Sequence, residues 1–60
     1  MEQGYSEVLT LKQCQEILQI GKNLMLYLIH NEEIPAFRVG KQWRIRQKDL
    51  ERYIEERLEY

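Results

Sequence analysis

The chain has 60 residues and a formal net charge of −1; 43% of its residues are hydrophobic and 32% charged, a balance typical of ordered globular proteins. This length allows one small domain and excludes large catalytic folds such as barrels of about 250 residues. A lone Cys14 cannot close an intrachain disulfide, and with a single His30 it cannot complete a four-ligand zinc site. No apolar run reaches the 18 or so residues that span a bilayer, and residues 1–10 lack a signal-peptide pattern. We therefore expect one soluble cytoplasmic domain over residues 1–60, with an ordered core at about 8–58, no metal, no cofactor and no membrane contact.

The charges are distributed unevenly along the chain. Residues 1–11 sum to −2, residues 12–48 to +4 and residues 49–60 to −3. No acidic residue interrupts the stretch 38–48, which carries five basic residues. The pattern indicates a local positive surface backed by an acidic end, although a pI of 5.8 is low for a nucleic-acid-binding protein. A solvated hairpin rich in lysine and arginine is the alternative interpretation.

The first predicted element is a short helix over residues 11–18. Thr10, followed three residues later by Gln13, has the spacing of a capping box, in which each side chain satisfies a free backbone N–H at the helix start. Apolar residues then recur at helical spacing, namely Leu11, Cys14, Ile17 and Leu18.

A second helix is predicted over residues 22–30, after a break at Gly21. Its apolar face consists of Met25, Leu28 and Ile29. Because so few residues separate the two helices, they must cross sharply, which is the helix-turn-helix arrangement. We expect Asn31 to end the helix in a left-handed conformation, and Pro35 prevents any continuation.

The following segment alternates with a period of two and predicts a β-hairpin. A three-residue loop at 40–42 makes one face wholly apolar and the other wholly basic, through the pairs Val39 with Trp43, Phe37 with Ile45, and Arg38 with Arg44. A two-residue turn at 40–41 would instead place Arg38 opposite Trp43, which is a poor match. We therefore expect the three-residue loop, with Trp43 supporting the hairpin from its apolar face.

The last predicted element is an amphipathic helix over residues 47–58 that braces the first two helices. Its apolar face carries Leu50, Tyr53, Ile54 and Leu58. Carboxylate pairs such as Asp49 with Glu51 lie on its outer face, where acids favour solubility. Since the chain also has no glycine-rich phosphate loop, we expect no enzymatic activity.

Several segments together resemble the MerR-like excisionase family of small DNA-binding proteins. They are Leu9-Thr10-Leu11-Lys12, Ile20-Gly21, Tyr27-Leu28-Ile29, Ile34-Pro35-Ala36-Phe37-Arg38-Val39-Gly40-Lys41-Gln42-Trp43-Arg44-Ile45 and Asp49-Leu50-Glu51. The resemblance, which covers about residues 8–54, implies a mainly α fold with a small β-hairpin: a winged helix-turn-helix of three helices and a two-stranded wing. It also implies that the second helix enters the major groove of double-stranded DNA while the wing follows the backbone or a minor groove.

The sequence departs from the family pattern in the second helix and just after it. Gly21 stands where a Ser or Thr cap is usual, and Leu24 and Tyr27 stand where Thr and Arg are common. Glu32 replaces a usual glycine before the hairpin. Base reading is therefore expected to be sparse, and exposed Leu24 and Leu26 could instead contact a protein.

The expected function is that of an excisionase-like accessory factor, which binds and bends attachment-site DNA to promote excision by a separate integrase, with neighbouring copies of itself on the DNA. Alternatives are a small transcription regulator of the same fold and a protein-interaction module that binds no DNA. The predicted DNA contacts are Lys22, Asn23, Tyr27, Arg38, Lys41, Gln42, Arg44 and Arg46, with Thr10, Lys12 and His30 as further candidates for phosphate contact.

Overall fold

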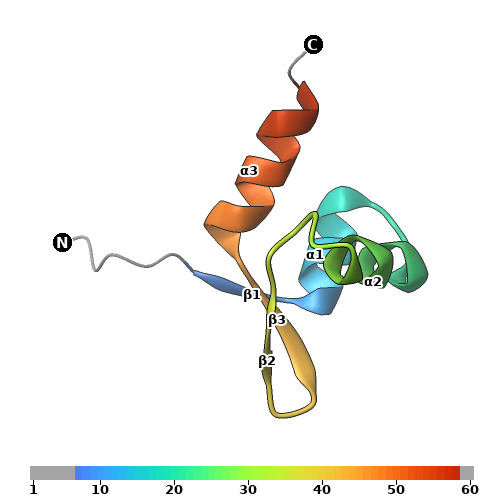
Figure 1. Cartoon of the computed structure of the whole chain (residues 1–60), viewed down its shortest axis with the longest axis vertical. Coiled ribbons are helices and arrows are strands. Elements are labelled where there is room, and N and C mark those ends of the chain that lie inside the picture. Colours follow the sequence, from blue (N-terminus) through green and yellow to red (C-terminus); the bar gives the residue numbers. More distant parts are fainter. Residues whose placement is uncertain (1–6, 59–60) are drawn as a thin grey trace, which may run out of the picture.

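The computed structural model describes residues 7–58. In chain order the elements are β1 (Val8–Thr10), α1 (Leu11–Leu18), α2 (Lys22–His30), β2 (Phe37–Val39), β3 (Gln42–Arg46) and α3 (Gln47–Leu58) (Figure 1). Three helices accompany one antiparallel sheet with the strand order β1-β3-β2. The winged helix-turn-helix prediction is confirmed, with the addition that β1 extends the two-stranded wing into a three-stranded sheet.

Helix α1 begins at the predicted capping box. The Thr10 hydroxyl accepts a hydrogen bond from the backbone N–H of Gln13 at 3.0 Å, and the Gln13 side chain accepts one from the backbone N–H of Thr10 at 2.9 Å. The helix ends at Leu18, and the cap residue Gln19 adopts a left-handed conformation with φ 59°. These local bonds explain why α1 has the bounds that the sequence predicts.

Helix α2 ends differently from the prediction. Asn31 has φ −89°, whereas Glu32 has φ 59° and takes the left-handed position. The backbone N–H of Glu32 donates to Ile29 O and that of Glu33 to Leu28 O, which is the pairing of a Schellman motif. In that motif the left-handed residue is the first one past the cap, so Asn31 is the cap and Glu32 occupies a position that favours glycine.

The register of the hairpin also corrects the prediction. Strand β2 pairs with β3 through Phe37 with Arg44, Arg38 with Trp43, and Val39 with Gln42. The connection is thus the two-residue turn Gly40–Lys41, and Gly40 has the positive φ, 64°, that a type II′ turn requires of its first central residue. The pair that seemed a poor match is favourable, because the Arg38 guanidinium lies 4.6 Å from the centre of the Trp43 ring.

This register mixes apolar and basic residues on both faces of the wing. Directly paired residues share a face, so Phe37 and Val39 lie beside Arg44 and Gln42 and are 42% and 55% exposed. Trp43 lies on the opposite face with Ile45, which is fully buried. The expected division into one apolar and one basic face is therefore wrong.

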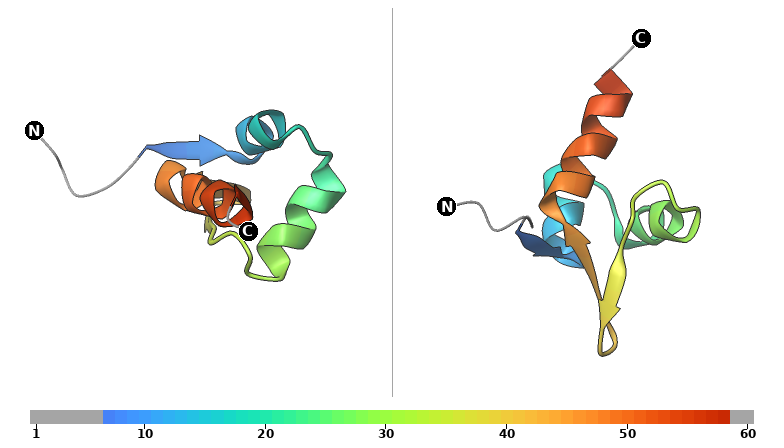
Figure 2. Two further views of the ribbon diagram at one scale, coloured as in Figure 1. Left: turned by 90° about the horizontal axis from the view of Figure 1, so that it is seen from above. Right: turned by 60° about the vertical axis from the view of Figure 1, so that its left-hand side comes forward.

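The core lies between α1, α2, the inner face of the sheet and the start of α3. Its buried members are Cys14, Met25, Leu28, Ile29, Ile34, Ile45 and Leu50. The expected brace is realised only in part: the first half of α3 contributes Leu50, but its last turns extend away from the sheet, where Leu58 is 62% exposed (Figures 1 and 2). An ion pair from Arg57 to Glu33 ties this outer half to the loop after α2. None of these three helices is both long and apolar enough to cross a membrane.

Candidate nucleic-acid interface

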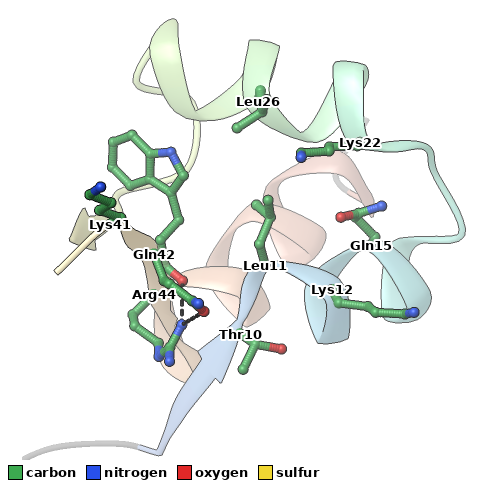
Figure 3. A pocket seen from close by; sticks show the side chains of 10 residues that line it. Thr10, Leu11, Lys12, Gln15, Lys22, Leu26, Lys41, Gln42 and Arg44 are labelled. Atoms are coloured by element: carbon green, nitrogen blue, oxygen red, sulfur yellow. Dashed lines mark hydrogen bonds between the residues drawn. The ribbon is translucent and has the colours of Figure 1, made fainter. Parts of the chain in front are cut away.

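A hollow opens between the start of α1, helix α2 and the tip of the wing. We call it the basic hollow, and its lining residues are Thr10, Leu11, Lys12, Gln15, Lys22, Leu26, Lys41, Gln42, Trp43 and Arg44 (Figure 3). Four of these ten residues are basic, and none of the lining side chains in the described part of the chain is acidic. Lys12 and Lys22 come from the two helices, whereas Lys41 and Arg44 come from the wing. The fold therefore gathers cations that are far apart in the sequence onto one concave surface.

The Arg44 side chain is held at the edge of the basic hollow by two hydrogen bonds. Its Nη1 donates to the carbonyl of Trp43 at 3.0 Å and to the Gln42 side chain at 3.4 Å. The pairs between β1 and β3 run from Arg46 to Arg44, so Trp43 lies beyond the end of β1. The guanidinium thus covers a backbone carbonyl past the end of β1 and is oriented there, while its remaining N–H groups can bind an anion.

Trp43 joins the wing to α2. Its ring lies under the Arg38 guanidinium on one side and meets the His30 ring edge-on, with the two ring centres 6.1 Å apart. The residue also packs against the hydrophobic core, which confirms the prediction that it supports the wing. Such packing fixes the distance between the wing tip and α2, and hence the width of the basic hollow.

Helix α2 presents two more predicted contacts outside the basic hollow. Asn23 is exposed, and Tyr27 is 57% exposed. Lys22 and Leu26 lie on the flank of the helix that faces the hollow. The side opposite these polar and aromatic groups is buried in the core, so α2 has one free surface next to the hollow.

Arg46 is engaged within the protein. Its Nε and Nη2 donate to the two carboxylate oxygens of Asp49 at 2.7 and 3.1 Å, and Asp49 is 5% exposed. These hydrogen bonds and the charge of the carboxylate raise the pKa of Arg46 above its ordinary value. Asp49 also lies in the first turn of α3, where a negative charge is favourable. The pair therefore fixes the junction at which β3 continues directly into α3.

The structure divides the predicted site residues into two groups. The basic hollow brings together Thr10, Lys12, Lys22, Lys41, Gln42 and Arg44. Outside it lie Asn23, Tyr27, His30, Arg38 and Arg46. Sequence reasoning missed Leu11, Gln15 and Leu26 as lining residues. The helical periodicity of α1 and α2 assigns a residue to the core or to solvent, but it does not show which solvent-facing side of the helix meets the wing.

The described residues offer little for other chemistry. In the range 7–58 no three His, Cys, Asp or Glu side chains are placed to hold a metal ion. Cys14 is fully buried, and burial raises the pKa of its thiol, so the thiol stays protonated and packs as a small hydrophobic group.

Comparison with known proteins agrees with this architecture. The sequence model of the family described as "Helix-turn-helix domain" matches residues 8–58, and the chain belongs to this family. The chain is similar to two proteins of Mycobacterium tuberculosis, from strain CDC 1551 / Oshkosh and strain H37Rv, each carrying the name "Putative DNA-binding protein". Each is 30% identical over 54 residues, which is 90% of this chain and 69% of the relative. No solved structure matches the chain significantly.

Proposed function

We propose that the chain binds double-stranded DNA through the basic hollow, with α2 beside the bases and the wing along the backbone. The observation that carries this proposal is the convergence of Lys12, Lys22, Lys41 and Arg44 on one concave surface without an acidic neighbour in the lining. A helix-turn-helix domain and relatives named for DNA binding support the same interpretation.

Phosphate neutralisation is the physical basis of this binding. Each cation that contacts a phosphate releases a condensed counterion, so log K falls with log salt by about 0.9 per contact. Arg44 is the best placed of the four, because its guanidinium is already oriented and loses little freedom on binding. Arg46 contributes less, since Asp49 already neutralises its charge.

We further infer an excisionase-like role, in which the protein shapes DNA for a separate integrase and performs no chemistry itself. The resemblance of the wing segment to that family supports this role. A small transcription regulator would use the same DNA-binding surface. Footprinting on the DNA that flanks the gene separates the two roles: protection beside a recombination site supports excision, and protection over a promoter supports regulation.

The salt dependence of DNA binding tests the proposal directly. The binding of a labelled 20-base-pair duplex is measured by fluorescence anisotropy at several salt concentrations for the native chain and for Lys41→Gln and Arg44→Gln. Each variant is expected to lower the slope of log K against log salt by about one. Arg52→Gln on α3 is the matched control, because it removes the same charge from an exposed position outside the hollow. Lack of binding at low salt, or an equal flattening by Arg52→Gln, would overturn the proposal.

A further inference from the structure

The free surface of α2 carries an amide, an aliphatic and an aromatic side chain next to the basic hollow. Asn23, Leu26 and Tyr27 are neighbours on it, at spacings of three and four residues. Asn23 and Tyr27 are exposed, while Leu26 is half-buried and points into the basic hollow (Figure 3). We call these three residues the α2 reading surface.

The α2 reading surface lies where base edges would come within reach. Lys22 and Leu26 line the basic hollow, so a phosphate bound there brings the adjacent bases alongside α2. Asn23 is the second residue of the helix, and residues near the start of a recognition helix are the ones that reach base edges. Apart from its chain neighbours, no atom of the described residues lies within 4 Å of a Cβ built on Gly21, so no other described part of the fold crowds the residue before the helix.

The chemistry of these side chains favours one kind of base pair. Guanine is read mainly by Arg or Lys, but α2 contains no Arg, and its single Lys faces the hollow. An Asn amide matches the N6 and N7 atoms of adenine, and apolar side chains match the 5-methyl group of thymine. The amide and the apolar side chains therefore both favour an A·T base pair.

We propose that the α2 reading surface recognises A·T base pairs in the major groove, with Asn23 on adenine and with Leu26 and Tyr27 on thymine methyl groups. This inference rests on the proposed DNA-binding function and names the sequence class that the site takes. Phosphate contacts in the basic hollow supply sequence-independent affinity, and the three α2 residues supply the discrimination.

Selection of DNA duplexes, followed by the removal of single functional groups from the selected sequence, tests the inference. Duplexes with a random centre are selected on the native chain, and A·T pairs are expected at the positions that the protein protects. The selected duplex is then compared with two analogues, one carrying uracil for thymine and one carrying 7-deazaadenine for adenine. Loss of the methyl group is expected to weaken binding about fourfold, the value of one buried CH₂ group, and loss of the N7 acceptor at least about fivefold.

Matched variants assign each effect to a side chain. Asn23→Ala should become insensitive to 7-deazaadenine and keep its sensitivity to uracil. Leu26→Ala should keep its sensitivity to 7-deazaadenine and lose part of its sensitivity to uracil, because Tyr27 still meets a thymine methyl group. Tyr27→Ala, at an exposed position that tolerates truncation, repeats the methyl test if Leu26→Ala fails to fold. All three should keep the native salt slope, because none of them removes a cation, and Arg52→Gln should keep both sensitivities.

The outcomes distinguish this inference from the proposed function. Selection of G·C pairs, or equal binding of the parent duplex and both analogues with a normal salt slope, overturns A·T recognition and leaves DNA binding intact. Failure to bind any duplex at low salt overturns both.

Discussion

Two concave surfaces of this small domain have a similar construction and opposite charge. The basic hollow is lined by the apolar side chains of Leu11, Leu26 and Trp43 and by four cations. A second groove, the acidic groove, lies between β1, α1 and α3 and is lined by Glu7, Leu9, Ile17, Gln47, Leu50, Glu51 and Ile54. Within the described part of the chain, no residue lines both surfaces, and the acidic groove has no basic lining residue.

The separation of the two surfaces explains how a chain with a net charge of −1 can carry a positively charged concave surface. Leu9 and Thr10 are adjacent in β1, yet they line different surfaces, because successive side chains of a strand point to opposite faces. The charges therefore separate in space although they nearly cancel in sum. A DNA duplex would be attracted by one side and repelled by the other, which orients the protein before contact.

The largest effect is expected at the buried residue that supports both surfaces. Ile45 is fully buried in the central strand and pairs with Leu9. Ile45→Ala is expected to lower the free energy of unfolding by about 2–5 kcal/mol, most of what a domain of this size has. Urea unfolding followed by circular dichroism measures the loss. Val39→Ala, at an exposed position of the wing, is the control and should cost far less; equal losses would show that Ile45 is not a central core residue.

A smaller effect is expected at the junction between β3, which lines the basic hollow, and α3, which lines the acidic groove. Asp49→Ala removes the buried partner of Arg46 and should cost about 1–3 kcal/mol of unfolding free energy. The control, Glu33→Ala, breaks the exposed ion pair with Arg57 and should cost less than about 1 kcal/mol. The same unfolding experiment ranks the two pairs, and the reverse order would contradict the structural role of Asp49.

A gain in stability is expected at a position outside both surfaces. Glu32 has φ 59°, a conformation that costs a residue with a side chain about 1–2 kcal/mol. Glu32→Gly should relieve this strain and, after the greater freedom of glycine in the unfolded chain is subtracted, stabilise the domain by about 0.5–1 kcal/mol. Glu32→Ala keeps the strain and should leave the melting temperature nearly unchanged. Equal melting temperatures for the two variants would refute this explanation.

The smallest effect, on DNA affinity, is expected when a charge is removed from the acidic groove. Glu51→Gln removes a carboxylate from the acidic groove, which is not part of the proposed DNA interface. Because exposed charges are screened beyond about 8 Å at physiological salt, DNA affinity should change less than about twofold and the salt slope should stay the same. Fluorescence anisotropy measures the DNA affinity and the salt slope of Glu51→Gln and of Lys41→Gln side by side. A change of slope equal to that of Lys41→Gln would mean that the DNA reaches both surfaces.

The elements that follow from short-range interactions were predictable. The bounds of the three helices and the capping box at Thr10 depend on residues only a few positions apart, and they agree with the sequence-based prediction. The hairpin register was not predictable in the same way, because the polarity of facing residues does not by itself decide between a two-residue and a three-residue turn. A glycine with positive φ and a guanidinium over Trp43 favour the shorter turn.

The candidate site shows the same division. The sequence alone determined that basic residues cluster in the wing and that Trp43 packs inward, since both follow from charge and alternation along one segment. Only the tertiary structure brings Lys12 and Lys22 together with Lys41 and Arg44. The reason is physical: local propensities act over a few residues, whereas the common surface arises when the hydrophobic core fixes two helices and a wing at one relative orientation.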